Sequence, residues 1–123
     1  MKTKICTDVE QSNKFIELGI DVNTADMCYH FIEINKTPLC IRWEKVHDDE
    51  KDNSLPAWSL AALFKYLSEI KPQEYTPTLF PTEGKWVLHF VEYGQGIVCA
   101  VTCDNPIDAC YKMILKLHEL NLL

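Results

Sequence analysis

Residues 75–120 constrain the fold more than any other part of this 123-residue chain. Strand-forming residues fill 85–93 and 97–103, and the glycine-containing turn at 94–96 separates them. Two such runs joined by a short turn are typical of a β-hairpin. Trp86, Leu88 and Phe90 share one alternating side of 85–93, and Val87, His89, Val91 and Tyr93 share the other, a pattern that indicates a central strand.

The residues on either side of this hairpin extend it. Residues 75–80 predict a further strand, and Pro77 indicates an edge position because proline has no backbone N–H to donate. Asn105 and Pro106 predict a helix start, since asparagine is a good N-cap and proline suits the first helical position. The segment therefore predicts a three-stranded antiparallel meander followed by an amphipathic helix.

Capping and strand signals organise the first half. Residues 7–10 have the pattern of a capping box, in which the Thr7 hydroxyl and the Glu10 side chain satisfy backbone N–H groups. The helix that follows ends before Gly19, with a Schellman motif. Residues 27–34 and 39–43 then predict a hairpin.

Residues 44–54 hold five acids against two bases and predict a solvated, mobile loop. A helix over 56–70 follows, because apolar residues recur there at helical spacing. The predicted order is α-β-β-α-β-β-β-α in a single domain, residues 1–123. It implies an α+β fold, an antiparallel sheet of meander plus hairpin with three helices packed mainly on one face.

Composition excludes several classes of function. The net charge of −6 argues against a nucleic-acid partner, which a basic face would attract. No apolar run is long enough for a membrane span, and the N-terminus has no signal-peptide pattern, so we expect a cytoplasmic protein. In that reducing compartment the six cysteines are expected to be free and mostly buried thiols.

Candidate chemistry is sparse. Cys99 and Cys103 lie on one strand roughly 13 Å apart, too far for one zinc ion, so no metal site and no cofactor are predicted. A nucleophilic pair would join Cys103, with a pKa lowered by the following helix N-terminus, to His89 as the base. The packing interpretation is that Cys103 is only a core residue.

A second alternative is a pocket for a small molecule, in a binding protein or an enzyme. Its candidate ligand-binding residues are two histidines, two tryptophans and one cysteine: His30, Trp58, Trp86, His89 and Cys103. The competing interpretation places Trp58 in the core, with Ser59 as a helix cap. No catalytic residue is predicted.

Several short segments resemble small uncharacterised proteins of gut Bacteroidetes and of their phages and prophages. They are Thr7-Asp8-Val9-Glu10-Gln11-Ser12, Leu18-Gly19, Thr24-Ala25-Asp26-Met27, Pro56-Ala57-Trp58-Ser59-Leu60 and Asn105-Pro106-Ile107-Asp108-Ala109. The resemblance implies a phage- or mobile-element-associated accessory protein and assigns no functional residue.

The functional expectation is a non-enzymatic protein-interaction module. Residues 27–34 carry apolar side chains on both alternating faces, while no catalytic spacing is present. The expected partner is another protein or a second copy in a homodimer, joined through a sheet edge or an apolar strand face.

Overall fold

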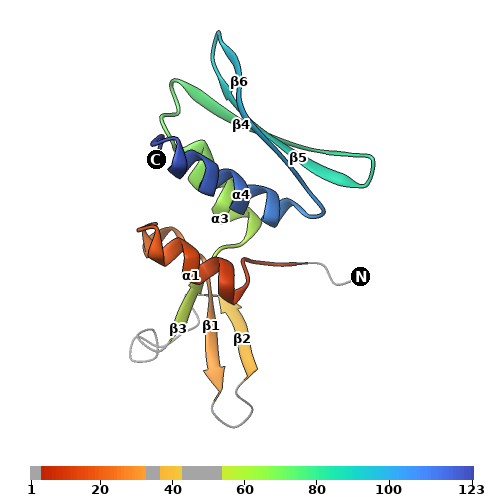
Figure 1. The fold of residues 1–123 in the computed structure, drawn as a ribbon. Helices are drawn as coiled ribbons and strands as arrows, with labels where there is room; N and C mark the ends of the chain where they lie inside the picture. The colour runs from red at the N-terminus through yellow and green to blue at the C-terminus, as the bar shows by residue number, and fades with distance from the viewer. Residues whose placement is uncertain (1–3, 33–36, 43–53) are drawn as a thin grey trace. The chain divides into compact units, whose positions relative to one another are not determined.

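The computed structural model describes residues 4–32, 37–42 and 54–123, and of residues 30–32 and 37–42 it describes the backbone alone (Figure 1). The chain divides into two compact units, each treated by itself below. We call Cys6–Ala62 the hairpin unit, and Met1–Ile5 with Leu63–Leu123 the meander unit. The division into two compact units does not test the prediction of a single domain, which stays a prediction.

The hairpin unit contains a helix and a three-stranded antiparallel sheet. Its elements are α1 (Val9–Glu17), the 3-10 turn η1 (Val22–Thr24), β1 (Met27–Ile32), β2 (Thr37–Arg42) and β3 (Ser54–Ala57). The strand order is β2-β1-β3, and α1 packs against β3. The predicted hairpin of β1 and β2 is therefore present, while its connecting turn lies outside the described residues.

Strand β3 is an addition to the predicted order, because residues 56 and 57 were expected to begin a helix. In the structure Pro56 pairs with Cys28 of β1, at the edge of the sheet. An edge strand tolerates proline, because one side of the strand has no neighbour that would need a backbone N–H donor. The helix α3 (Leu60–Ser68) begins later, where the Ser59 hydroxyl accepts a hydrogen bond from the backbone N–H of Ala62.

Helix α1 has a capping box, but one residue further along than predicted. Asp8 is the N-cap: its carboxylate accepts from the Gln11 backbone N–H at 2.8 Å, and the Gln11 side chain accepts from the Asp8 N–H at 3.1 Å. The prediction of Thr7 with Glu10 was wrong, because the Thr7 side chain is used inside the core. The predicted Schellman ending is confirmed: Gly19 has φ +83°, and the Ile20 N–H donates to the Phe15 carbonyl.

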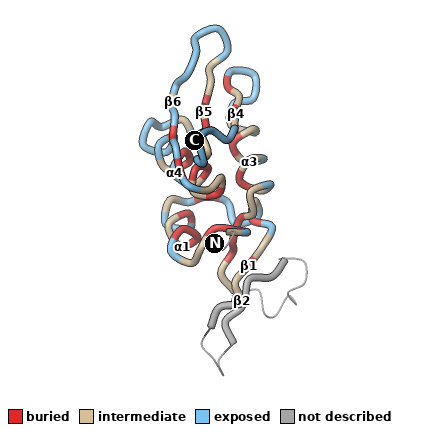
Figure 2. Tube along the Cα trace, turned by 90° about the vertical axis from the view of Figure 1, so that its right-hand side faces the viewer, coloured by how far each residue is buried: buried red, intermediate tan, exposed pale blue. Residues whose placement is uncertain are grey.

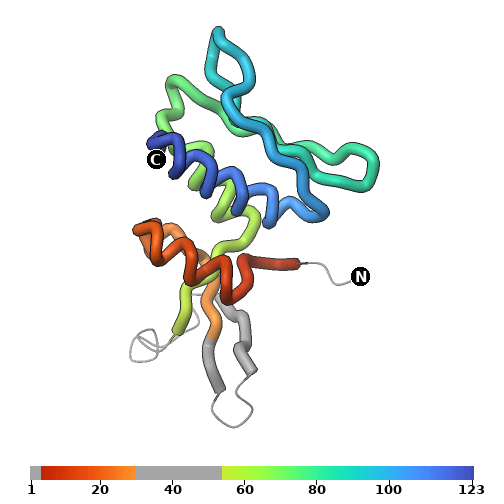
Figure 3. The backbone as a smooth tube through the Cα atoms, viewed as in Figure 1, coloured from red at the N-terminus to blue at the C-terminus, as the bar shows by residue number. Residues whose placement is uncertain are grey.

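The meander unit confirms the prediction from residues 75–120. It contains the strands β4 (Tyr75–Thr82), β5 (Lys85–Glu92) and β6 (Gly96–Cys103), in the antiparallel order β4-β5-β6, followed by α4 (Pro106–Glu119). Figure 3 traces the two hairpins. Asn105 caps α4 and accepts from the Asp108 backbone N–H at 2.9 Å.

Helix α4 packs against β5 and β6 and covers one face of their sheet. That inner face presents Leu88, Phe90 and Val101, all buried. The side chains that α4 buries are Ile107, Ala109, Cys110, Met113, Ile114 and Leu117. These two apolar surfaces form the core of the unit.

The α+β class and the predicted order of elements are confirmed, with β3 added. The meander and the hairpin lie in two separate sheets. The predicted acidic loop over 44–54 lies outside the described residues, except for Ser54, which begins β3. No helix in the described ranges has both the length and the apolar character that crossing a bilayer requires.

Candidate functional site

The five candidate ligand-binding residues do not form one site. His30 and Trp58 belong to the hairpin unit, and the other three belong to the meander unit. His30 lies on β1 opposite Leu39 and Ser54, and its side chain is outside the described residues. The binding role of this set stays a prediction.

Trp58 is a core residue of the hairpin unit. Its side chain is buried, and its ring lies edge-on to Phe15 with centroids 5.0 Å apart. The indole N–H donates to the Thr24 hydroxyl at 2.9 Å, so the polar atom of the ring has a partner within the fold. This geometry is that of a packed residue and leaves no ring face for a ligand.

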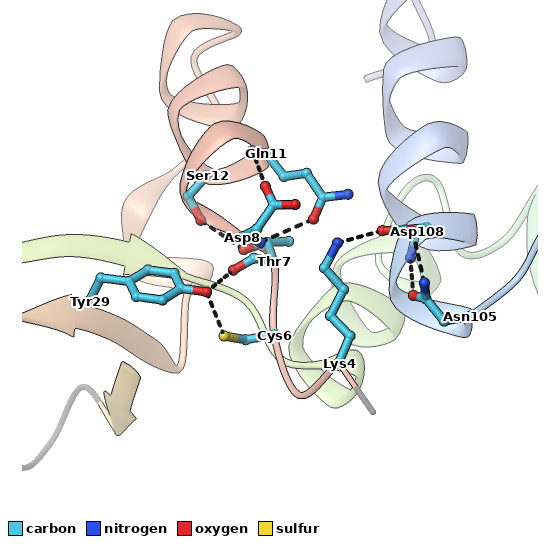
Figure 4. Close-up of polar contacts among 9 residues, drawn as sticks. All are labelled: Lys4, Cys6, Thr7, Asp8, Gln11, Ser12, Tyr29, Asn105 and Asp108. Atoms are coloured by element: carbon cyan, nitrogen blue, oxygen red, sulfur yellow. Dashed lines mark hydrogen bonds and ion pairs between the residues drawn. The ribbon is translucent and has the colours of Figure 1, made fainter. Parts of the chain in front are cut away.

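A buried polar cluster around Thr7 joins the chain entering α1 to Tyr29 of β1 (Figure 4). The same cluster reaches Trp58, at the end of β3. The Thr7 hydroxyl accepts from the Trp58 backbone N–H at 3.0 Å and lies 2.8 Å from the Ser12 hydroxyl. The Thr7 carbonyl accepts from the Tyr29 hydroxyl at 2.9 Å. Sequence reasoning assigned Thr7 only to helix capping, and nothing in the local pattern indicates its long-range partners.

Two hydrogen bonds to Asp26 hold the residue before α3. The Asp26 carboxylate accepts from both the backbone N–H and the hydroxyl of Ser59. The expectation that Trp58 is core and Ser59 is a cap is therefore confirmed. The polar side chains of Thr7, Asp26 and Ser59 thus make hydrogen bonds within the hairpin unit.

Trp86 and Cys103 are cross-strand partners in the meander unit. Both lie on the face that α4 covers, because Trp86 is two residues from the buried Leu88 and Cys103 is two residues from the buried Val101. His89 of β5 lies on the opposite face, between its cross-strand partners Thr78 of β4 and Ala100 of β6. The register thus separates His89 from Cys103, and the predicted nucleophile–base pair is not formed.

The environment of Cys103 also opposes a nucleophilic role. Burial raises the pKa of the Cys103 thiol, while the nearby Lys112 ammonium acts in the opposite direction. Burial also raises the pKa of the Cys110 thiol to about 12, and the neighbouring Cys103 adds to the effect. The predicted lowering by the helix N-terminus was wrong, because removal of the thiol from water outweighs it.

The N-terminus of α4 is already occupied by side chains of the unit. The Asp108 carboxylate accepts from the Lys4 ammonium at 2.7 Å and from the Asn105 side-chain amide at 2.8 Å (Figure 4). This carboxylate lies in the first turn, where a negative charge is favoured. The positive end of the helix is thus neutralised from within.

The described cysteines Cys6, Cys28, Cys99, Cys103 and Cys110 are free thiols, and all but Cys99 are buried, which confirms the expectation for them. No group of three histidine, cysteine, aspartate or glutamate side chains that would hold a metal ion occurs in the described ranges.

The remaining candidate is the face of the meander that α4 leaves uncovered, which we call the outer face. Alternation along the strands assigns to it the threonines and Phe80 of β4, the side chains around His89 on β5, and the exposed residues of β6. Its members are Thr76, Thr78, Phe80, Thr82, Lys85, Val87, His89, Val91, Ile97, Ala100 and Thr102.

The outer face mixes five apolar residues with four threonines, one histidine and one lysine, and it has no carboxylate. Phe80 is 36% exposed and Ile97 is 58% exposed, and the Phe80 ring lies edge-on to His89 at a centroid distance of 5.2 Å. Its one ionised side chain, Lys85, sits at an end and pairs with Asp104 at 2.5 Å. A face without a carboxylate is unusual on a chain of net charge −6. Such a surface is suited to contact with another protein.

No protein-family model, no curated protein and no solved structure matches this chain.

Proposed function

We propose that the chain is a non-enzymatic protein-interaction module that binds through the outer face of the β4-β5-β6 sheet. The observation that carries the proposal is the exposure of apolar side chains on a sheet face that no described element of the meander unit covers. Single exposed apolar residues are normal on soluble proteins, and grouped ones indicate an interaction site. Here Phe80 is the cross-strand partner of Val87, and Ile97 is the cross-strand partner of Val91.

The supporting contrast is with the inner face of the same sheet. There Leu88 and Phe90 are fully buried beneath α4, so the unit needs no second layer to complete its core. The apolar residues on the other side of β5 are therefore not required by the packing of the unit itself. Strand β1 was the first candidate surface, but the structure leaves its side chains from His30 onward outside the described residues.

The arrangement of candidate residues favours binding over catalysis. Trp58 is enclosed, Cys103 has a raised pKa, and His89 lies on the face opposite to Cys103. A small-molecule pocket lined by these residues therefore has no support from their positions. A nucleophile needs a thiolate and an adjacent base, and neither condition is met here.

The experiment measures the exposed apolar surface of the outer face. The double variant Phe80→Thr/Ile97→Thr keeps β-forming residues while removing exposed apolar area. We expect the wild type to bind an environment-sensitive apolar dye and the variant to lose this binding. Equal dye binding by wild type and variant would remove the outer face as the interaction surface.

The cellular setting is part of the same proposal. We place the protein in the cytoplasm as an accessory protein of a phage or mobile element, on the strength of the short resembling segments around residues 7–12, 56–60 and 105–109. The genes beside its own test the setting: phage structural or integration genes support it, and a conserved housekeeping operon contradicts it.

A further inference from the structure

We infer that the chain also pairs with a second copy of itself, joined edge to edge along β6 in an antiparallel two-fold pair. This inference goes beyond the proposed function, because the pair uses the edge of the sheet and leaves its outer face uncovered. The pair would extend the three-stranded meander into one six-stranded sheet, whose outer face then continues across both copies.

The two edges of the sheet differ in their protection. Strand β4 carries Pro77 and Pro81, which cannot donate backbone hydrogen bonds to a further strand. Strand β6 has no proline and no charged residue over its eight positions. Natural proteins block free edges with proline, lysine, short strands or bulges. Strand β6 has no proline and no lysine, and its one bulge is at Val98, outside the stretch Cys99–Cys103. Of the two edges, β6 is therefore the one open to pairing.

The pairing surface of β6 is free within the described part of the chain, where β5 is its one strand neighbour. Ile97 is 58% exposed and Val98 is 38% exposed, and Figure 2 shows most of β6 in the colour of exposed residues. Val98 is the extra residue of a bulge, since Phe90 pairs with Cys99 and Val91 with Ile97. The regular stretch Cys99–Cys103 is left to pair.

A second copy suits this edge better than an unrelated extended peptide. An antiparallel pair is related by a two-fold axis, so the same edge meets itself and every outward N–H finds an outward carbonyl. Like charges do not oppose each other, because β6 is uncharged and the adjacent Asp104 is neutralised by Lys85. An acidic chain of net charge −6 needs such a neutral region in order to approach its own copy.

The expected affinity is modest. The pairing stretch Cys99–Cys103 is roughly 17 Å long, which is short for a standard protein interface, so we expect a dimer dissociation constant on the order of 10–100 µM. The experiment is sedimentation equilibrium of the full chain over a concentration series. It should show the 14.2 kDa monomer shifting to twice that mass.

The matched variants are Ala100→Lys and Thr78→Lys. Both residues are exposed and flank His89 on the outer face, but Ala100 lies on β6 and Thr78 on β4. Ala100 is one position from Val101, the middle of the pairing stretch. We expect Ala100→Lys to weaken the dimer by about tenfold, because it brings two ammonium groups close to each other near the two-fold axis. Thr78→Lys should leave the dissociation constant unchanged.

Amide hydrogen exchange followed by NMR supplies a readout that depends on the backbone. Every second N–H of β6 points away from β5, and these alternate amides should exchange slowly at high protein concentration and rapidly on dilution. The other β6 amides, bonded to β5, should be protected at both concentrations. This alternation is specific to strand pairing.

The outcomes separate the two proposals. A dimer without alternating protection, or one weakened equally by both lysines, overturns edge pairing while leaving the outer face as the contact. A strict monomer that still binds the apolar dye overturns self-pairing and leaves another protein, including an extended peptide on the edge, as the partner. A monomer without dye binding overturns both.

Discussion

Replacing Thr7 by valine tests the buried polar cluster of the hairpin unit. Valine has nearly the shape of threonine, so the substitution exchanges the hydroxyl for a methyl group without opening a cavity. Thr7 is fully buried, and its hydroxyl is the acceptor for the Trp58 backbone N–H at 3.0 Å. In the variant that N–H has no acceptor and no access to water.

The loss of free energy of unfolding in Thr7→Val comes from the polar groups that the substitution leaves without a hydrogen-bond partner. An unsatisfied buried donor costs about 1–3 kcal/mol, and the Ser12 hydroxyl, 2.8 Å from Thr7, also loses its partner. The Ser12 hydroxyl can rotate toward the backbone carbonyl four residues earlier, which limits its share. We therefore expect Thr7→Val to lower the free energy of unfolding by about 2–4 kcal/mol.

Thr7→Ser is the matched control, because it keeps the oxygen and removes one buried methyl, at a cost of about 1 kcal/mol. Both variants are compared with wild type by urea unfolding followed by near-ultraviolet circular dichroism, with the slopes checked for equality. If valine costs no more than serine, the Thr7 hydroxyl does not hold the Trp58 backbone, and the role assigned to the cluster is wrong.

Three further predictions test the local structure. Asp8→Ala should lower the free energy of unfolding by about 1 kcal/mol by removing the N-cap of α1, whereas Glu10→Ala should have almost no effect; equal costs in urea unfolding would contradict the observed register. Cys110 should resist alkylation in the native protein. The pKa of the Cys110 thiol is about 12 in the folded protein and 9.0 ordinarily, so as the pH rises the thiol ionises first in the unfolded chain. The contribution of this thiol to the free energy of unfolding is therefore complete below pH 9 and is lost between pH 9 and about 12. Cys110→Ala should flatten this part of the stability–pH curve, and an unchanged curve would show that other groups cause it. Lys85→Ala should leave the midpoint of urea unfolding unchanged, because its ion pair with Asp104 is exposed; a clear drop would show an energetic role for that pair.

The candidate site was only partly accessible to sequence reasoning. The periodicity of β5 correctly put Trp86 and His89 on opposite faces, but it did not tell which face α4 would cover. That choice decides whether His89 is on an interaction surface or in the core. It depends on packing between elements distant in sequence, which a pattern along one strand does not contain.

The sequence by itself determined the features that arise within a few residues. The cap at Asn105, the left-handed Gly19 and the meander of 75–103 depend on local hydrogen bonds, φ preferences and alternation, and all are present. At the start of α1 the neighbouring Thr7 and Asp8 are both suitable N-caps by local rules. The sequence pattern predicted Thr7, whereas Asp8 is the cap in the structure.

The tertiary structure decided what local rules leave equivalent. Thr7 is withdrawn from capping because the buried N–H of Trp58, 51 residues away, needs an acceptor. Pro56 is in a strand and not in the predicted helix, because its segment pairs with the edge of β1. The meander and the hairpin form separate sheets because each pairs within its own unit. In each case the physical cause is a contact between distant segments, whose energy exists only once the chain has folded.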